Sequence, residues 1–140
     1  MPDAQTPVLI GAERLESFVA DIFRANGCDE AEAGRISHHL LGANLAGHDS
    51  HGVIQIPGYI DRVKAGHIVP GAPFTIVQES RTTTVVDGNW GFGYVINEKA
   101  MALTIEKANS ENIAATTVFR PVVGLATRFS KPRLPSRGSS

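Results

Sequence analysis

The chain has 140 residues, of which 42% are hydrophobic and 19% charged, and its formal net charge is −1. This length predicts one domain with a substantial hydrophobic core. No apolar run approaches the roughly 20 residues that span a bilayer, and the N-terminus lacks the pattern of a signal peptide. The single cysteine, Cys28, has no internal disulfide partner. We therefore expect a cytoplasmic protein that does not contact a membrane.

The charge is divided unevenly along the chain. From Arg120 onward there are five basic residues and no acidic ones, whereas the preceding part has eight basic and fourteen acidic residues. An acidic body with a short basic tail is not the pattern of a folded nucleic-acid-binding surface, so no nucleic-acid partner is expected.

The first half of the chain predicts helices. Residues 12–26 carry an apolar stripe at helical spacing that includes Phe18 and Phe23, and residues 29–46 predict a second helix capped by Asp29. A third helical pattern runs to Ala65-Gly66 and contains Pro57. This helix either begins near the proline or begins earlier and bends there.

The second half predicts strands and one helix. Residues 74–79 and 82–87 are rich in β-branched side chains and predict a hairpin joined by Ser80-Arg81. Residues 95–109 predict a helix, and residues 113–119 predict a buried strand.

The periodic pattern ends near residue 120. The last part of the chain is rich in proline, serine and basic residues, and it buries too little apolar surface to offset its ordering entropy. The sequence thus predicts an α/β domain over residues 1–119 and a disordered tail over residues 120–140.

The stretch GHDSHGV at residues 47–53 groups two histidines, an aspartate and a serine between glycines. An imidazole has the right unperturbed pKa to exchange a proton near neutral pH. In the competing interpretation, Asp49 or Ser50 only caps the next helix, and the histidines are solvated. A metal site would draw on His48, His51 and the upstream His38–His39 pair, but no CxxC or HExxH spacing is present, so no metal is expected.

Two other features admit a structural interpretation. DGNWGFGYV at residues 87–95 could place Gly91 and Gly93 in a phosphate loop at a helix N-terminus. The alternative, which we favour, is a turn in which Trp90 and Phe92 pack on the core, because the preceding strand belongs to a hairpin rather than a βαβ unit. Tyr59 and the His38–His39 pair are interpreted as structural.

The order of four segments gives a family resemblance. NLAGHDSHGV, IPGYIDRVKAGHIVPG, TTVVDGNWGFG and KAMALTIEKANSENIAATTV follow one another as in the malate/L-lactate dehydrogenase-like family of NAD(P)-dependent oxidoreductases, with the hydroxycarboxylate dehydrogenase B type as the most similar branch. The resemblance covers about residues 8–119. It implies a distinct α/β fold that is not a Rossmann fold, a homodimer, and hydride transfer between NAD or NADP and a 2-oxo or 2-hydroxy acid.

The resemblance also implies roles for three residues. His51 matches the family's proposed acid/base histidine, and Ser50 matches the serine that contacts the substrate. Many family members have an arginine four residues after the histidine, where this chain has Gln55. An arginine suits a carboxylate by its bidentate geometry, so Gln55 is expected to bear on substrate identity.

Family members are more than twice as long, and their later segments hold most of the nicotinamide cofactor. The match ends at Phe119-Arg120, so we expect a truncated or frameshifted product that lacks the cofactor-binding half. The alternative is an inactive remnant or a small non-enzymatic domain.

Overall fold

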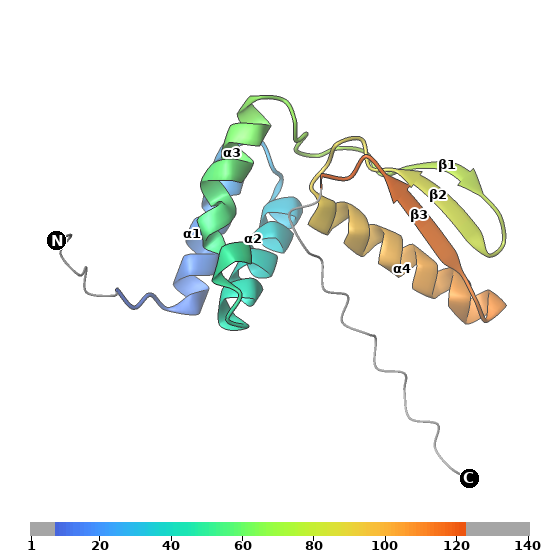
Figure 1. Ribbon diagram of the computed structural model, residues 1–140, viewed down its shortest axis with the longest axis horizontal. Helices are drawn as coiled ribbons and strands as arrows, with labels where there is room; N and C mark the ends of the chain where they lie inside the picture. The colour runs from blue at the N-terminus through green and yellow to red at the C-terminus, as the bar shows by residue number, and fades with distance from the viewer. Residues whose placement is uncertain (1–7, 123–140) are drawn as a thin grey trace, which may run out of the picture.

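A computed structural model describes residues 8–122 and has an α/β architecture in which helices precede a small sheet (Figure 1). The elements in chain order are α1 (Ala12–Ala25), α2 (Glu30–Leu45), two short 3₁₀ turns (Asp49–His51 and Val53–Gln55), α3 (Ile56–Lys64), β1 (Thr75–Glu79), β2 (Thr83–Asp87), α4 (Gly93–Glu111) and β3 (Ala115–Phe119). The predicted fold class is confirmed. In the described part of the chain, no helix combines the length and apolar character needed to cross a membrane.

Helices α1, α2 and α3 pack together beside the layer formed by α4 and the sheet (Figure 1). The helical core contains Phe23 of α1 and Ile36 and Leu40 of α2, all fully buried. Asp29 caps α2 as predicted, because its carboxylate accepts a hydrogen bond from the Glu32 backbone N–H at 2.7 Å. Phe18, which shares the predicted stripe of α1, is 61% exposed in the described chain.

The position of Pro57 settles where the third helix begins. Helix α3 starts at Ile56, so the proline occupies its first turn, where the missing N–H breaks no helical hydrogen bond. Tyr59 follows in the next turn and is buried against the core.

The sheet has the strand order β1-β2-β3 and is mixed. Strand β1 pairs antiparallel with β2, with a bulge between Ile76 and Gln78, whereas β2 pairs parallel with β3. Because α4 connects β2 to β3, the prediction that β2 belongs to a hairpin rather than a βαβ unit is wrong. The strand belongs to both.

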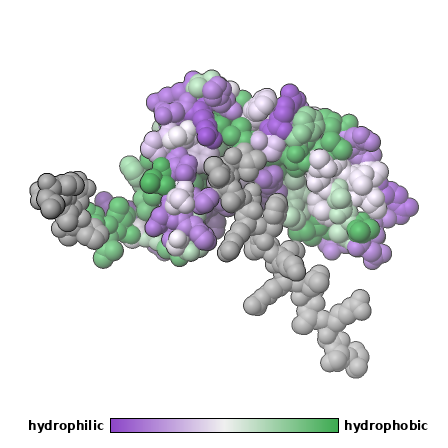
Figure 2. Space-filling view, viewed as in Figure 1, coloured by the Kyte–Doolittle hydropathy of each residue, from purple (hydrophilic) through white to green (hydrophobic). Residues whose placement is uncertain are grey.

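Two burial predictions are also wrong. Strand β3 alternates between exposed and half-buried residues, because Thr116 and Val118 lie against α4 while the opposite face has no cover among residues 8–122. Trp90 is 51% exposed, although Phe92 is buried as expected. Figure 2 shows hydrophobic surface over the sheet and beside the N-terminal residues.

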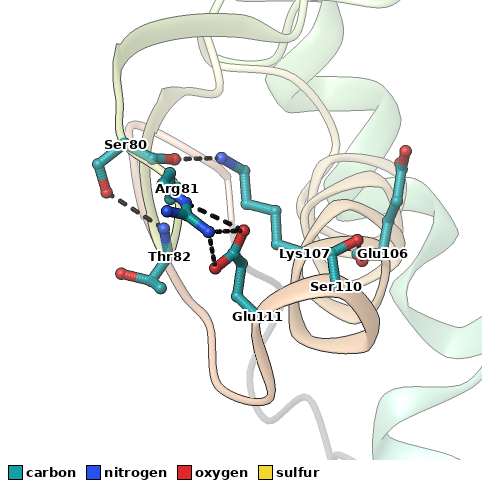
Figure 3. A network of polar contacts seen from close by, with 7 residues as sticks. All are labelled: Ser80, Arg81, Thr82, Glu106, Lys107, Ser110 and Glu111. Atoms are coloured by element: carbon teal, nitrogen blue, oxygen red, sulfur yellow. Dashed lines mark hydrogen bonds and ion pairs between the residues drawn. The ribbon is translucent and has the colours of Figure 1, made fainter.

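Polar contacts join the β1–β2 turn to the C-terminal end of α4 (Figure 3). Arg81 donates to both carboxylate oxygens of Glu111, at 2.9 and 3.0 Å. Lys107 donates to the Ser80 carbonyl at 2.6 Å and pairs with Glu79 at 2.8 Å. These contacts fix the far end of the hairpin on α4.

The described structure continues past the predicted boundary at residue 119. Arg120 pairs with the carboxylate of Asp87, and this hydrogen bond lowers the pKa of Asp87. The Val122 backbone N–H donates to the Gly91 carbonyl at 3.0 Å, and the Gly93 N–H donates back to the Val122 carbonyl at 2.8 Å. The disorder expected for the remainder, residues 123–140, lies outside the described residues and stays a prediction.

Removing the cap of α2 should destabilise the domain. We expect Asp29→Ala to lower the free energy of unfolding by about 0.5–2 kcal/mol, because one backbone N–H of the first turn loses its acceptor. Urea denaturation followed by circular dichroism measures this change. Asp29→Asn keeps a side-chain acceptor and serves as the control. Equal losses in the two variants would show that the cap hydrogen bond is not the source of the effect.

Candidate active site

A pocket of about 390 Å³ opens between the second half of α2, the loop that follows it and the start of α4. Histidine side chains supply most of its polar lining, and small residues of α2 supply part of its floor. The lining consists of His38, His39, Gly42, Ala43, Ala46, His48, His51 and Tyr94. The predicted acid/base residue thus faces a cavity that can hold a small organic acid.

The loop is shaped by backbone hydrogen bonds. Gly47 ends α2 with a φ of 77°, a left-handed conformation that glycine adopts without strain. The backbone of the next residue stays bonded to the end of α2, because the His48 N–H donates to the Ala43 carbonyl at 2.8 Å. The His51 N–H then donates to the His48 carbonyl at 2.9 Å, which closes a short 3₁₀ turn.

His51 is half-buried and has a neighbour at one ring nitrogen. The Ser50 Oγ lies 2.9 Å from His51 Nδ1, within hydrogen-bond distance. Since that contact occupies Nδ1, Nε2 is the nitrogen left to meet a ligand. The His48 and His51 rings are 6.4 Å apart, centroid to centroid, and meet in an edge-on arrangement.

Gln55 lies close to these residues but does not line the pocket. Its amide Nε2 donates to the Ser50 carbonyl at 2.7 Å, and both side chains are exposed. The structure therefore brings together Ser50, His51 and Gln55 through hydrogen bonds, while only His51 reaches the pocket wall. The substrate contacts expected for Ser50 and Gln55 stay predictions.

The sequence analysis did not identify His39 as part of the pocket wall. Its ring stacks on Tyr94 with centroids 3.8 Å apart, on the wall that His51 also lines. Burial lowers the pKa of His39, and the nearby His38 lowers it further, which favours the neutral ring. The spacing of His39, Ala43 and Ala46 at i, i+4 and i+7 was the available signal, because it places them on one helix face.

Tyr94 links the pocket to the core. Its hydroxyl lies 2.9 Å from the hydroxyl of Tyr59, and burial together with this hydrogen bond raises the pKa of Tyr59. The structural interpretation of Tyr59 agrees with its burial. His38, by contrast, is exposed and lies 3.1 Å from Glu16.

The glycine-rich turn before α4 does not fit a phosphate group. The Gly91 and Gly93 N–H groups already donate to the Gly88 and Val122 carbonyls, both at 2.8 Å. A Cβ at Gly91 would lie 2.9 Å from the Ala72 Cβ, so this glycine is needed for close packing. Within residues 8–122, no three metal-ligating side chains converge on a position that could hold an ion.

Comparisons with known proteins identify relatives of this chain among dehydrogenases. Hydroxycarboxylate dehydrogenase B of Escherichia coli O157:H7 is 43% identical over 107 residues, which are 76% of this chain and 30% of that protein. L-sulfolactate dehydrogenase of Methanocaldococcus jannaschii is 34% identical over 106 residues, 76% of this chain and 31% of that protein.

Solved structures of malate and lactate dehydrogenases also superpose on most of this chain. A putative malate/lactate dehydrogenase from E. coli superposes with a TM-score of 0.79 at 38% identity, covering 82% of this chain and 32% of that one. Malate dehydrogenase from Entamoeba histolytica gives a TM-score of 0.76 at 34% identity, covering 81% and 32%.

The chain spans about a third of the length of the relatives it matches. The malate/L-lactate dehydrogenase family matches residues 10–121, which include every element of the described fold. This chain belongs to the malate/L-lactate dehydrogenase family.

Proposed function

We propose that this chain carries the proton-transfer part of an oxidoreductase that interconverts 2-oxo and 2-hydroxy acids. The observation that carries the proposal is the placement of His51, with Nδ1 next to the Ser50 hydroxyl and its ring in the wall of the pocket. The relatives are named as dehydrogenases of hydroxycarboxylates, malate and sulfolactate. Such acids share a hydroxyl group on the carbon next to a carboxylate.

His51 would act as the general acid in reduction and the general base in oxidation. As a hydride reaches the carbonyl carbon, the π electron pair moves to oxygen, which takes a proton from the His51 imidazolium. In the reverse direction, neutral His51 would accept the hydroxyl proton, and the hydride would pass to an oxidised nicotinamide cofactor. Nε2 is the nitrogen that faces the substrate oxygen, because Ser50 lies at Nδ1.

Ser50 and Gln55 are proposed to contact the substrate. The Gln55 amide uses one N–H on the Ser50 carbonyl, and it has a second N–H and a carbonyl oxygen to offer a ligand. A neutral amide here would bind a carboxylate less strongly than an arginine would. We therefore propose that Gln55 contributes less to binding of the substrate carboxylate than an arginine at this position would.

The proposed hydride carrier is NAD or NADP. The glycine-rich turn does not fit its phosphates, so we propose that polypeptide other than residues 8–122 holds most of the cofactor. A cytoplasmic location and a homodimer are part of the same proposal. The location is supported by the buried free thiol of Cys28, which fits a reducing compartment. The homodimer is supported by exposed apolar side chains that a second copy could cover, namely those of Ile76, Val77 and Phe119.

The purified 140-residue chain should bind NADH and NADPH weakly or not at all. The reason is that the turn before α4 has its amides occupied by other backbone carbonyls. Fluorescence titration or calorimetry measures the affinity. A micromolar Kd would contradict this expectation and would make the chain by itself a candidate enzyme.

The role of His51 can be tested in a chimera. Residues 10–121 would replace the matching segment of E. coli hydroxycarboxylate dehydrogenase B, so that the remaining two thirds of the relative is present. His51→Ala should lower kcat for 2-oxo-acid reduction by about 10²–10⁴. Nicotinamide binding should stay nearly unchanged, because the imidazole serves the substrate oxygen.

His48→Ala is the matched control for the chimera, since His48 lines the same pocket three residues away. It should cost far less activity than His51→Ala. Equal losses at the two positions would point to loop structure instead of proton transfer. Near-normal turnover in His51→Ala would remove the proposed role, and an active chimera that never depends on His51 would favour the non-enzymatic alternative for this segment.

A further inference from the structure

Asn44 joins the two ends of the His51 loop through one side chain. The residue lies in the last turn of α2, and its amide Nδ2 donates to the Asp49 carboxylate at 2.7 Å. Its Oδ1 accepts from the Val53 backbone N–H at 2.9 Å. An asparagine amide carries a donor and an acceptor on one carbon, and Asn44 uses both on residues that flank His51.

Gly52 provides the space that this arrangement needs. Its φ is −93°, so Gly52 is not in the left-handed conformation that most often calls for glycine. A Cβ at Gly52 would instead overlap the amide group of Asn44, and Gly52 itself is buried. The glycine after the motif histidine is therefore explained by the close approach of the Asn44 side chain to the loop backbone.

His51 lies inside the segment that Asn44 fixes. Only three residues separate Asp49 from Val53, and the His51 N–H is already bonded to the His48 carbonyl at 2.9 Å. With both flanking residues held by Asn44, so short a segment has little freedom to move the imidazole away from the α2 face. Displacement of about 1 Å in such a group can cost about 10²-fold in rate.

We propose that Asn44 is the positioning residue for His51, holding the loop through its paired contacts with Asp49 and Val53. The catalytic consequence rests on the proposed function, whereas the structural consequence can be measured without it. Asn44 does not line the pocket, so it acts through the loop and not on a ligand.

An exchange of the two side chains tests this in the 140-residue chain. Asn44→Asp keeps the acceptor for Val53 but places a carboxylate against Asp49. Asp49→Asn keeps a neutral hydrogen bond with Asn44. The double variant restores a donor–acceptor pair with the roles reversed, so its loop should resemble the wild type.

Two NMR measurements serve as structural readouts. The ¹⁵N signals of the His51 imidazole should shift in Asn44→Asp and return in the double variant. Amide hydrogen exchange of Val53 should accelerate by about 5–10-fold in Asn44→Ala, which removes its acceptor, and much less in Asn44→Asp. Asn109→Asp, on the exposed side of α4, controls for the added charge.

Turnover of the chimera gives the catalytic readout. Asn44→Asp should lower kcat by about 10–100-fold with little change in nicotinamide binding, and the double variant should recover to within about threefold of wild type. If the chimera has no turnover that depends on His51, the proposed function fails, while the NMR signals still decide whether Asn44 positions the ring.

The proposal is overturned if Asn44→Asp leaves the His51 signals as in wild type. It is also overturned if the double variant behaves like the sum of the single variants, because the two side chains would then act independently. A loss in Asp49→Asn that the double variant does not recover would assign Asp49 a role of its own and would equally remove the pairing that we propose.

Discussion

An aromatic cluster from three elements holds the helical part of this protein to α4. Phe23 of α1 packs edge-on against Phe92, at the start of α4, with ring centroids 5.7 Å apart, and Tyr59 of α3 lies 6.0 Å from Phe92. Rings in such offset and edge-on arrangements contribute more than their buried area alone. Because α2 packs on the same core through Ile36 and Leu40, the cluster fixes the distance between α2 and the start of α4.

The pocket lies where this apolar cluster gives way to polar groups. Tyr94 follows Phe92 by two residues, and its hydroxyl meets that of Tyr59 at the edge of the core. Its ring then faces outward onto His39. The α2 and α4 side of the cavity combines small apolar residues with His39 and Tyr94, and the loop adds His48 and His51, so apolar and polar groups both line it.

The positions of helices and strands could be predicted from the sequence more accurately than their burial and pairing. Helical periodicity and the Asp29 cap are local signals, so α1 and α2 could be predicted from neighbouring residues, whereas the sequence leaves two alternatives for the start of α3. Burial of β3 and Trp90 depends on what lies across the sheet and beside the turn, and no local pattern reports that. The parallel pairing of β2 with β3 was missed for the same reason, because it joins residues about 30 positions apart.

The candidate site shows the same limit. The histidine, serine and glycine of GHDSHGV could be singled out because they are adjacent in the sequence. His39 could be placed on a helix face, but its contact with Tyr94 spans 55 positions and needs the aromatic cluster to exist. Asn44 gave no signal in the sequence, since an asparagine near a helix end is common and its partners five and nine residues later depend on the path of the loop.

The structure also changes how the motif itself is understood. The polar turn and the proton-transfer loop are alternatives in the sequence, yet three residues of the motif shape the turn around His51. Gly47 ends α2, Asp49 accepts from Asn44, and Gly52 leaves room for that amide. Their combined effect is to hold His51 against the pocket, with Ser50 beside its ring. A histidine that must meet a substrate oxygen within hydrogen-bond distance requires such a held loop, because proton transfer depends first on geometry and only then on pKa.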